Sequence, residues 1–262
     1  MSDYAPPRPA SPAPVPRAVT RADVTDALRL GWRDFRRAPG VSLFFGGVVA
    51  LGGLAMLWLL QAYRQPLTII PLAIGFPLVA PFLAAGTYEI ARRLDAGEAV
   101  TLSAVLDFAG GQGGRQAGWM AFVVLFIFWM WMYQARILIA LFLDMGAFAS
   151  PGALAAAVFG TAEGWTMLAV GTVSGGILAG ILFATTVIAM PLLVEREMDV
   201  VTAIVTSWKT VIASPGPMLL WGGIVGGLTL AATVPAFVGL WVVFPVLGLA
   251  TWHLYRRAIP AL

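Results

Sequence analysis

The sequence contains no cysteine and a single histidine, His253, among its 262 residues. The absence of cysteine excludes disulfide bonds, thiolate metal sites and a cysteine nucleophile. Charged residues are also scarce, at 11% of the chain, whereas 60% of the residues are hydrophobic and the mean hydropathy is +0.87. A soluble core of this size cannot bury so much apolar surface. The composition therefore predicts that lipid is the solvent for most of the protein.

The basic residues lie at the ends of apolar runs and in the N-terminal segment. The net charge of +3 and the pI of about 9.7 would also suit a nucleic-acid-binding protein. Membrane topology, however, places Lys and Arg at these positions. We interpret the charge as a signal of orientation, and we expect the lipid bilayer, not nucleic acid, as the partner.

Two segments precede the first apolar run. Residues 1–19 are rich in proline and alanine, which predicts a disordered cytoplasmic tail. In residues 20–38 the apolar side chains share one helical face, and charged side chains cover the other. The apolar residues are Val24, Ala27, Leu28, Trp32 and Phe35. This pattern predicts an amphipathic helix at the membrane interface, followed by a break at Pro39.

Six apolar runs are long enough, or nearly so, to cross about 30 Å of hydrocarbon. They are Val41–Leu60, Leu67–Tyr88, Gly118–Leu138, Thr166–Leu193, Met218–Pro235 and Phe237–His253. We therefore predict an all-α polytopic membrane protein with about six transmembrane helices in three hairpins. The hairpins occupy residues 39–94, 118–193 (with an outer loop) and 215–262. A cytoplasmic connector (95–117) and a second amphipathic interfacial helix (194–214) separate them.

Lys and Arg are distributed unequally between the two sides of the predicted membrane. They lie in the N-terminal segment and after the second, fourth and sixth runs, while the opposite side has only Arg64 and Arg136. The positive-inside rule then places both termini in the cytoplasm. We expect a multi-pass protein of the bacterial inner membrane.

The chain contains an internal repeat, because Asp23–Gly47 matches Asp199–Gly223 without a gap. Each copy runs from an amphipathic stretch into an apolar span, and both copies start on the same side, which predicts a parallel repeat. Thr101–Phe108 resembles a degenerate third copy. The residues expected at the membrane interface are Trp32, Arg36 and Arg37 in the first copy and Trp208 and Lys209 in the second.

The segments Pro191–Gly223 and Gly31–Gly47 resemble a family of bacterial integral membrane proteins catalogued as a domain of unknown function. The resemblance covers nearly the whole chain and implies a polytopic inner-membrane protein with about six helices. Some members are labelled cytochrome c oxidase subunit I. Such a subunit needs several histidines to ligate two haems and copper, so the single His253 excludes that catalytic role.

Glycines recur at helix-packing spacing in three of the predicted spans, where they would let helix backbones meet. They are Gly46 and Gly47 in the first span, Gly171, Gly175, Gly176 and Gly180 in the fourth, and Gly222, Gly223, Gly226 and Gly227 in the fifth. They could form an interface with a partner or a second copy, or pack the six helices against one another. We favour packing within the chain.

Few polar residues interrupt the spans. Gln134, Arg136, Asp144 and Glu163 could form a polar cluster on a ligand or ion route near the outer face. The simpler interpretation is that Arg136 extends to the interface and pairs with Asp144 or Glu163. The third span is also rich in aromatic residues, which suits an interfacial belt better than a cofactor site. We expect no cofactor, no metal and no catalytic residues.

Two classes of function remain. The first is a noncatalytic accessory, assembly or scaffold component that packs against a larger membrane complex, respiratory or photosynthetic, against itself, or against lipid. The second is a small transporter or channel with a polar site near Arg136. The first class accounts for the glycine-rich faces and the nearly uncharged spans, and we favour it; an enzyme is the least expected class.

Overall fold

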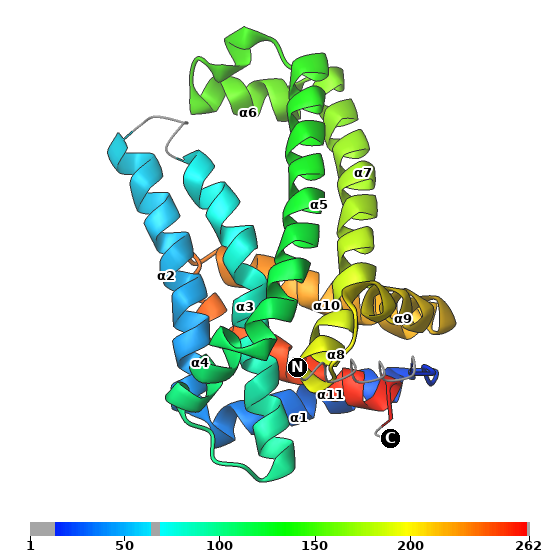
Figure 1. Ribbon diagram of the computed structural model, residues 1–262. Helices are drawn as coiled ribbons and strands as arrows, with labels where there is room; N and C mark the ends of the chain where they lie inside the picture. Colours follow the sequence, from blue (N-terminus) through cyan, green and yellow to red (C-terminus); the bar gives the residue numbers. More distant parts are fainter. Residues whose placement is uncertain (1–13, 64–68, 261–262) are drawn as a thin grey trace, which may run out of the picture. The chain divides into compact units, whose positions relative to one another are not determined.

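The computed structural model describes residues 14–63 and 69–260. Throughout these residues the chain forms helices joined by short connections, without strands (Figure 1). The predicted all-α fold is confirmed. Most of the predicted tail, residues 1–13, lies outside the described residues.

Long apolar helices are interspersed with shorter helices along the chain. In the first half these are α1 (Arg21–Arg37), α2 (Pro39–Tyr63), α3 (Ile69–Ala96), α4 (Leu102–Gly110) and α5 (Gln112–Phe142). The second half contains the 3₁₀ helix η2 (Met145–Phe148), α6 (Pro151–Gly160), α7 (Ala162–Thr186), α8 (Ala189–Glu195), α9 (Val200–Ala213), α10 (Pro215–Thr233) and α11 (Leu240–Ala258).

The chain forms two compact units. The second unit is Val123–Phe183, with most of α5 and α7 together with η2 and α6. The first unit contains the other described residues. Each unit has its own candidate site.

Four stretches of the described residues are long and apolar enough to cross a membrane. They are Pro39–Leu59, Gly118–Phe142, Ala162–Glu195 and Pro215–Thr233. This result supports a polytopic membrane protein, while the number of six spans stays a prediction. The predicted sixth span falls on α11, which is not among the four. The second half of α11 carries His253, Arg256 and Arg257, which lower its apolar character.

The two repeat copies share one local structure, a helix, a one-residue break and a second helix. The break falls on Ala38 in the first copy (φ −130°, ψ 58°) and on Ser214 in the second (φ −140°, ψ 58°). A proline starts the following helix in each copy, because its missing N–H needs no partner at that position. Figure 1 shows that the break turns α2 crosswise to α1.

The third, degenerate copy has a related arrangement. The Thr101 side chain caps α4 by accepting a hydrogen bond from the Ala104 N–H, and Gly111 separates α4 from α5. A short helix therefore precedes each of the three long-helix segments that begin with α2, α5 and α10.

Helix α11 is the centre of the first unit, where it contacts α1, α2, α3, α8 and α10. Glycines allow these close crossings. A Cβ added to Gly31 of α1 would lie 2.6 Å from the Ala250 nitrogen, and one added to Gly46 of α2 would meet the Trp241 carbonyl. A Cβ at Gly248 of α11 would meet the Thr87 hydroxyl of α3. These contacts are closer than any side chain permits, so the crossings require glycine.

The short helices α1 and α9 expose opposite kinds of surface. Val24, Ala27 and Phe35 of α1 are buried, so the apolar face of α1 packs in the protein, and its arginines point outward. In α9 the buried face consists of Ala203, Thr206, Ser207 and Thr210. Val201, Val205 and Ile212 of α9 are exposed, as suits a helix covered by lipid.

The chain before α1 is held in place by backbone hydrogen bonds. The Arg17 N–H donates to the Ala258 carbonyl at 2.7 Å, and the Val19 N–H donates to the Ser214 hydroxyl at 2.8 Å. Val19 is buried. Arg17 and Val19, for which the sequence predicted a disordered tail, thus bond to α11 and to the residue before α10.

Candidate functional site

The second unit contains an open groove of about 500 Å³ between α5 and α7. Its lining is apolar and aromatic except for one amide and one hydroxyl group. The lining residues are Phe126, Trp129, Met130, Tyr133, Gln134, Ile137, Leu138, Val170 and Ser174. This volume lies within the range of small-molecule sites, and the groove follows the predicted aromatic span.

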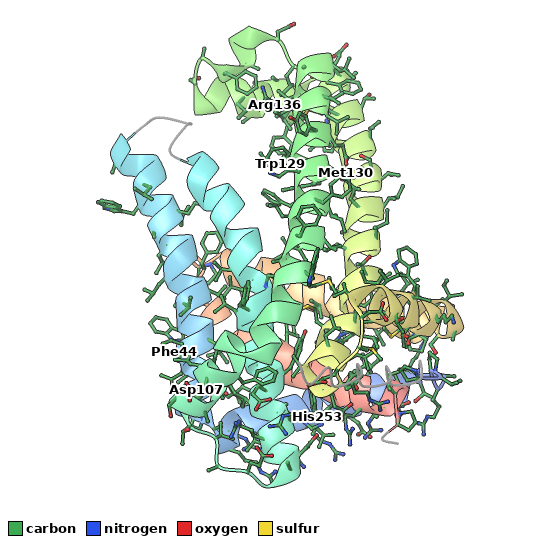
Figure 2. The ribbon with its side chains drawn as sticks, viewed as in Figure 1. Phe44, Asp107, Trp129, Met130, Arg136 and His253 are labelled. Carbon is green, nitrogen blue, oxygen red and sulfur yellow. The ribbon has the colours of Figure 1, made fainter. Side chains whose placement is uncertain are left out.

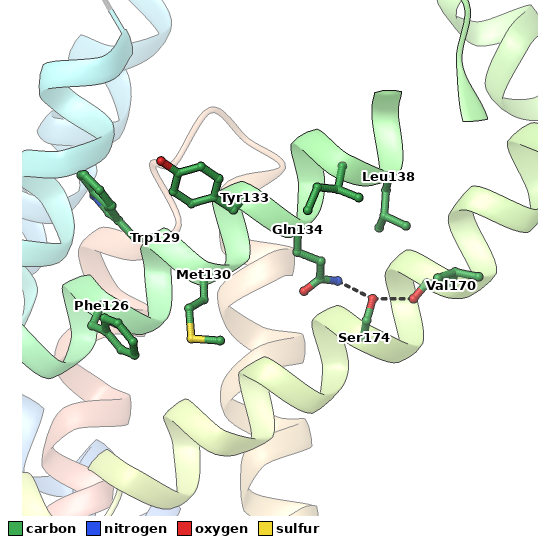
Figure 3. Close-up of a pocket in the computed structure, with 9 residues that line it drawn as sticks. Phe126, Trp129, Met130, Tyr133, Gln134, Leu138, Val170 and Ser174 are labelled. Atoms are coloured by element: carbon green, nitrogen blue, oxygen red, sulfur yellow. Dashed lines mark hydrogen bonds between the residues drawn. The ribbon is translucent and has the colours of Figure 1, made fainter. Parts of the chain in front are cut away.

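A short chain of hydrogen bonds links the two helices in the groove (Figure 3). The Gln134 side-chain amide donates to the Ser174 hydroxyl, which donates to the Val170 carbonyl at 2.6 Å. The Trp129 and Tyr133 rings meet edge to face with centroids 6.2 Å apart. The groove thus combines flat apolar walls with one polar point.

The first unit contains a second candidate site, a polar cluster at the end of α11 that we call the α11 cluster. It consists of Trp252, His253, Tyr255, Arg256 and Arg257, and each residue bonds a carboxylate on α1, α3 or α8. Figure 2 marks His253 among these nitrogen- and oxygen-bearing side chains.

His253 forms the most buried carboxylate contact of the α11 cluster. Its Nε2 lies 2.6 Å from the Asp34 carboxylate, and both side chains are buried. The Arg33 guanidinium also donates to Asp34, at 3.0 Å. Burial acts to raise the pKa of Asp34, but the hydrogen bonds from His253 and Arg33 outweigh it and lower this pKa below its usual value. Asp34 is therefore an ionised partner for the histidine.

The other cluster residues tie α11 to three further elements. The Trp252 indole donates to Asp95 of α3 at 2.8 Å, and Arg257 donates to Asp23 of α1 at 2.7 Å. Tyr255 and Arg256 both donate to Glu195 of α8. The α11 cluster therefore holds α1, α3 and α8 around α11.

Three residues of this region could ligate a metal ion. Ligand atoms of Asp34, Asp95 and His253 lie within 4.8 Å of one another. However, the imidazole and the Arg33 guanidinium already pair with Asp34, and Trp252 pairs with Asp95. These contacts describe an ion-pair network, and the positive arginine beside it opposes a cation.

The structure does not bring the predicted polar cluster together. Arg136, Asp144 and Glu163 are exposed, and the described residues contain no ion pair between them. Of these four side chains, only that of Gln134 has a hydrogen-bond partner within the described part of the chain, and this partner is Ser174. The expected pairing of Arg136 with Asp144 or Glu163 is thus not observed. Figure 2 shows Arg136 on α5, the same helix as Trp129 and Met130.

The predicted glycines divide into two groups. Gly46 and Gly47 face Trp241 of α11, while Gly171 and Gly175 lie at ordinary contact distance from Leu138 and Trp131 of α5. At five further predicted glycines, an added Cβ would meet no neighbouring atom within 4 Å. These five are Gly176 and Gly180 of α7 and Gly223, Gly226 and Gly227 of α10. They leave stretches of helix backbone open to another helix.

The predicted interface residues lie on the short helices. Trp32 is half exposed and stacks on Phe35 at 5.5 Å, and Arg36 and Arg37 are exposed in the last turn of α1. Trp208 donates to the Thr185 hydroxyl at 3.2 Å, and Lys209 is exposed.

The α11 cluster was not predicted, although the sequence carries a signal for it. Thr87–Arg93 (TYEIARR) and Thr251–Arg257 (TWHLYRR) share a threonine, an aromatic residue and two arginines at equal spacing. In the α3 segment, the buried carboxylate of Glu89 accepts hydrogen bonds from Arg92 and Arg93 at 2.7 Å each. Both helix ends thus use paired arginines to compensate buried carboxylates.

A family model described as "Predicted integral membrane protein (DUF2189)" matches residues 69–195, from α3 to the end of α8. This segment is similar to that family. The match to this family of unknown function confirms the predicted resemblance over these residues. The matched segment contains the residues that line the groove. Both repeat copies lie outside the matched segment. Neither the curated proteins nor the solved structures gave a significant match to the chain.

Proposed function

We propose that the protein is a noncatalytic component of the bacterial inner membrane that packs, as an accessory, assembly or scaffold protein, against a larger membrane complex. The observation that carries this proposal is that α7 and α10 each carry glycines that face open space. In membranes, small residues drive helix association because they let two backbones approach closely.

The glycines of the first unit provide the internal comparison. Gly31 and Gly46 lie at helix crossings where a side chain would collide with α11. Gly176, Gly180 and Gly226 face open space instead. Glycine costs helix stability relative to alanine, by about 1 kcal/mol. A partner helix would give these open glycines a role that offsets this cost.

The proposed orientation has both termini in the cytoplasm. The last turns of α1, α3 and α11 carry arginines, and the positive-inside rule assigns such ends to the cytoplasmic side.

The test compares glycine enlargement with loss of the exposed arginine. Gly176→Leu and Gly226→Leu should leave the membrane level of the protein unchanged and abolish recovery of its partner, because the added side chains hold the helices apart. Gly46→Leu is the matched control, and it should prevent folding, since it collides with Trp241. Arg136→Gln should be mild.

The opposite order would favour the transporter class. A severe loss of cell function in Arg136→Gln at a normal protein level, with partner recovery unaffected by the glycine variants, would overturn the proposed packing function.

A further inference from the structure

The Gln134 side chain is only partly hydrogen-bonded. Its amide has two N–H donors and a carbonyl acceptor, and one N–H donates to Ser174. Among the described residues, the other N–H and the carbonyl oxygen have no partner. Gln134 lies eight residues, or about 12 Å, inside the end of the span Gly118–Phe142. Hydrocarbon offers no hydrogen bond there, so a free amide is costly.

Apolar residues repeat along α5 beside this amide with the spacing of a helix-pairing seam. Phe126, Met130, Tyr133 and Ile137 follow one another at intervals of four, three and four residues. Each is about half exposed or more, at 60%, 48%, 59% and 57%. This is the 3.5-residue period with which one helix packs along another. The seam extends about 16 Å along the helix, longer than a compact ligand requires.

We propose that this seam is the contact surface for a second copy of the same chain, and that the two Gln134 side chains pair across it. An amide is both donor and acceptor, so two amides satisfy each other reciprocally. Two copies with the same orientation in the membrane place Gln134 at the same depth, and a two-fold axis along the membrane normal brings the side chains together. An unrelated helix would need a polar group at this depth by coincidence.

The groove beside the dimer seam and the open glycines of the proposed function lie on different sides of α7. Ser174 lines the groove, and Gly176 follows two residues later, which turns it about 200° around the helix. The dimer thus extends the proposed function without using the same surface. Each proposal can fail alone, because dimer formation and partner recovery are separate measurements.

Cysteine crosslinking tests the dimer directly, because the chain has no cysteine of its own. Met130→Cys and Ile137→Cys in native membranes should form disulfide-linked dimers on mild oxidation. Ile139→Cys is the control, since Ile139 is exposed on the opposite side of α5. It should crosslink at least fivefold less. Equal crosslinking at all three positions, or no dimer at any, would overturn the proposal.

The role of the amide is tested in the Met130→Cys background. Gln134→Leu should reduce the dimer at least fivefold at an unchanged membrane level, whereas Ser174→Ala should leave it intact. An undiminished dimer in Gln134→Leu would show that the amide does not hold the two copies together. A crosslink to a protein of different mass would assign the seam to another partner and contradict self-association.

Discussion

At the scale of single residues, the first unit buries carboxylates and exposes the arginines that pair with them. Asp34 and Glu89 are fully buried, while Arg33, Arg37, Arg92 and Arg93 reach solvent. Long arginine side chains can cover apolar surface and keep their charge in water. The single histidine takes part in this network, so its role in the fold is that of a buried structural partner.

Removal of one partner of the buried pair should be costly. Asp34→Ala should lower the free energy of unfolding by about 3 kcal/mol, because it leaves the His253 side chain buried without its carboxylate. Denaturant unfolding in detergent measures this change. The double variant Asp34→Ala/His253→Leu should recover part of the loss. Additive losses would show that the two residues do not interact energetically.

Asp23 should make folding stability depend on acid pH. Burial acts to raise the pKa of Asp23, but hydrogen bonds from Thr20 and Arg257 lower it from 3.8 to about 2. A carboxylate with a lowered folded pKa stabilises the fold above its unfolded value, and the contribution is lost as the pH falls through about 2. Unfolding measured at pH 4 and pH 2 should therefore show a smaller loss in Asp23→Asn than in the wild type. An equal loss would contradict this role of Asp23.

At the scale of elements, the repeated unit is a short helix, a break and a long helix. The break positions Ala38 and Ser214 have nearly the same backbone angles, while α1 and α9 expose opposite surfaces. Duplication thus kept the turn into the membrane and changed what each short helix contacts. The turn between α10 and α11 has a different backbone conformation, in which Ala236 and Phe237 have φ values of 51° and 66°.

Ala236 has a left-handed backbone conformation, which glycine adopts with less steric strain. Non-glycine residues pay about 1 kcal/mol for a positive φ, so Ala236→Gly should raise the free energy of unfolding by up to about 1 kcal/mol. Gly97 has a φ of 69°, and Gly97→Ala is the matched variant with the opposite expected sign. Thermal unfolding of both variants tests the assignment, which would fail if Ala236→Gly were clearly destabilising.

The sequence predicted the elements of the fold better than their contacts. Hydrophobic runs and proline breaks located the long helices and the short helices α1 and α9, because these features act locally. The amphipathic pattern of α1 could not show that Val24 and Phe35 pack in the protein, since lipid and protein cores select the same apolar face. The Asp34–His253 pair joins residues 219 positions apart, and no local pattern reports such a pair.

The sequence likewise predicted some residues of the candidate site but not their contacts. Aromatic residues and Gln134 marked the third span, but the partner Ser174 came from another helix. The glycine pattern indicated close packing without showing where it occurs. The structure separates Gly46, at a crossing with α11, from Gly176, which faces open space.

At the scale of the whole molecule, the predicted orientation can be tested with introduced cysteines. Ala99→Cys and Lys209→Cys should resist an impermeant thiol reagent in intact cells, because both positions are proposed to be cytoplasmic. Ala149→Cys, in the predicted outer loop, should react and serves as the control. Labelling of the first two positions from outside would reverse the orientation.

The measurement that tests the packing function most directly is photo-crosslinking from the open face of α7 in native membranes. A photoreactive residue at Val173, which is 66% exposed and one turn from Gly176, should give a protein adduct of defined mass. The same residue at Leu51 of α2, also exposed, should react mainly with lipid. A partner adduct from Val173 that disappears in Gly176→Leu is the predicted result. Only lipid adducts from Val173, in a protein still required by the cell, would contradict the packing function.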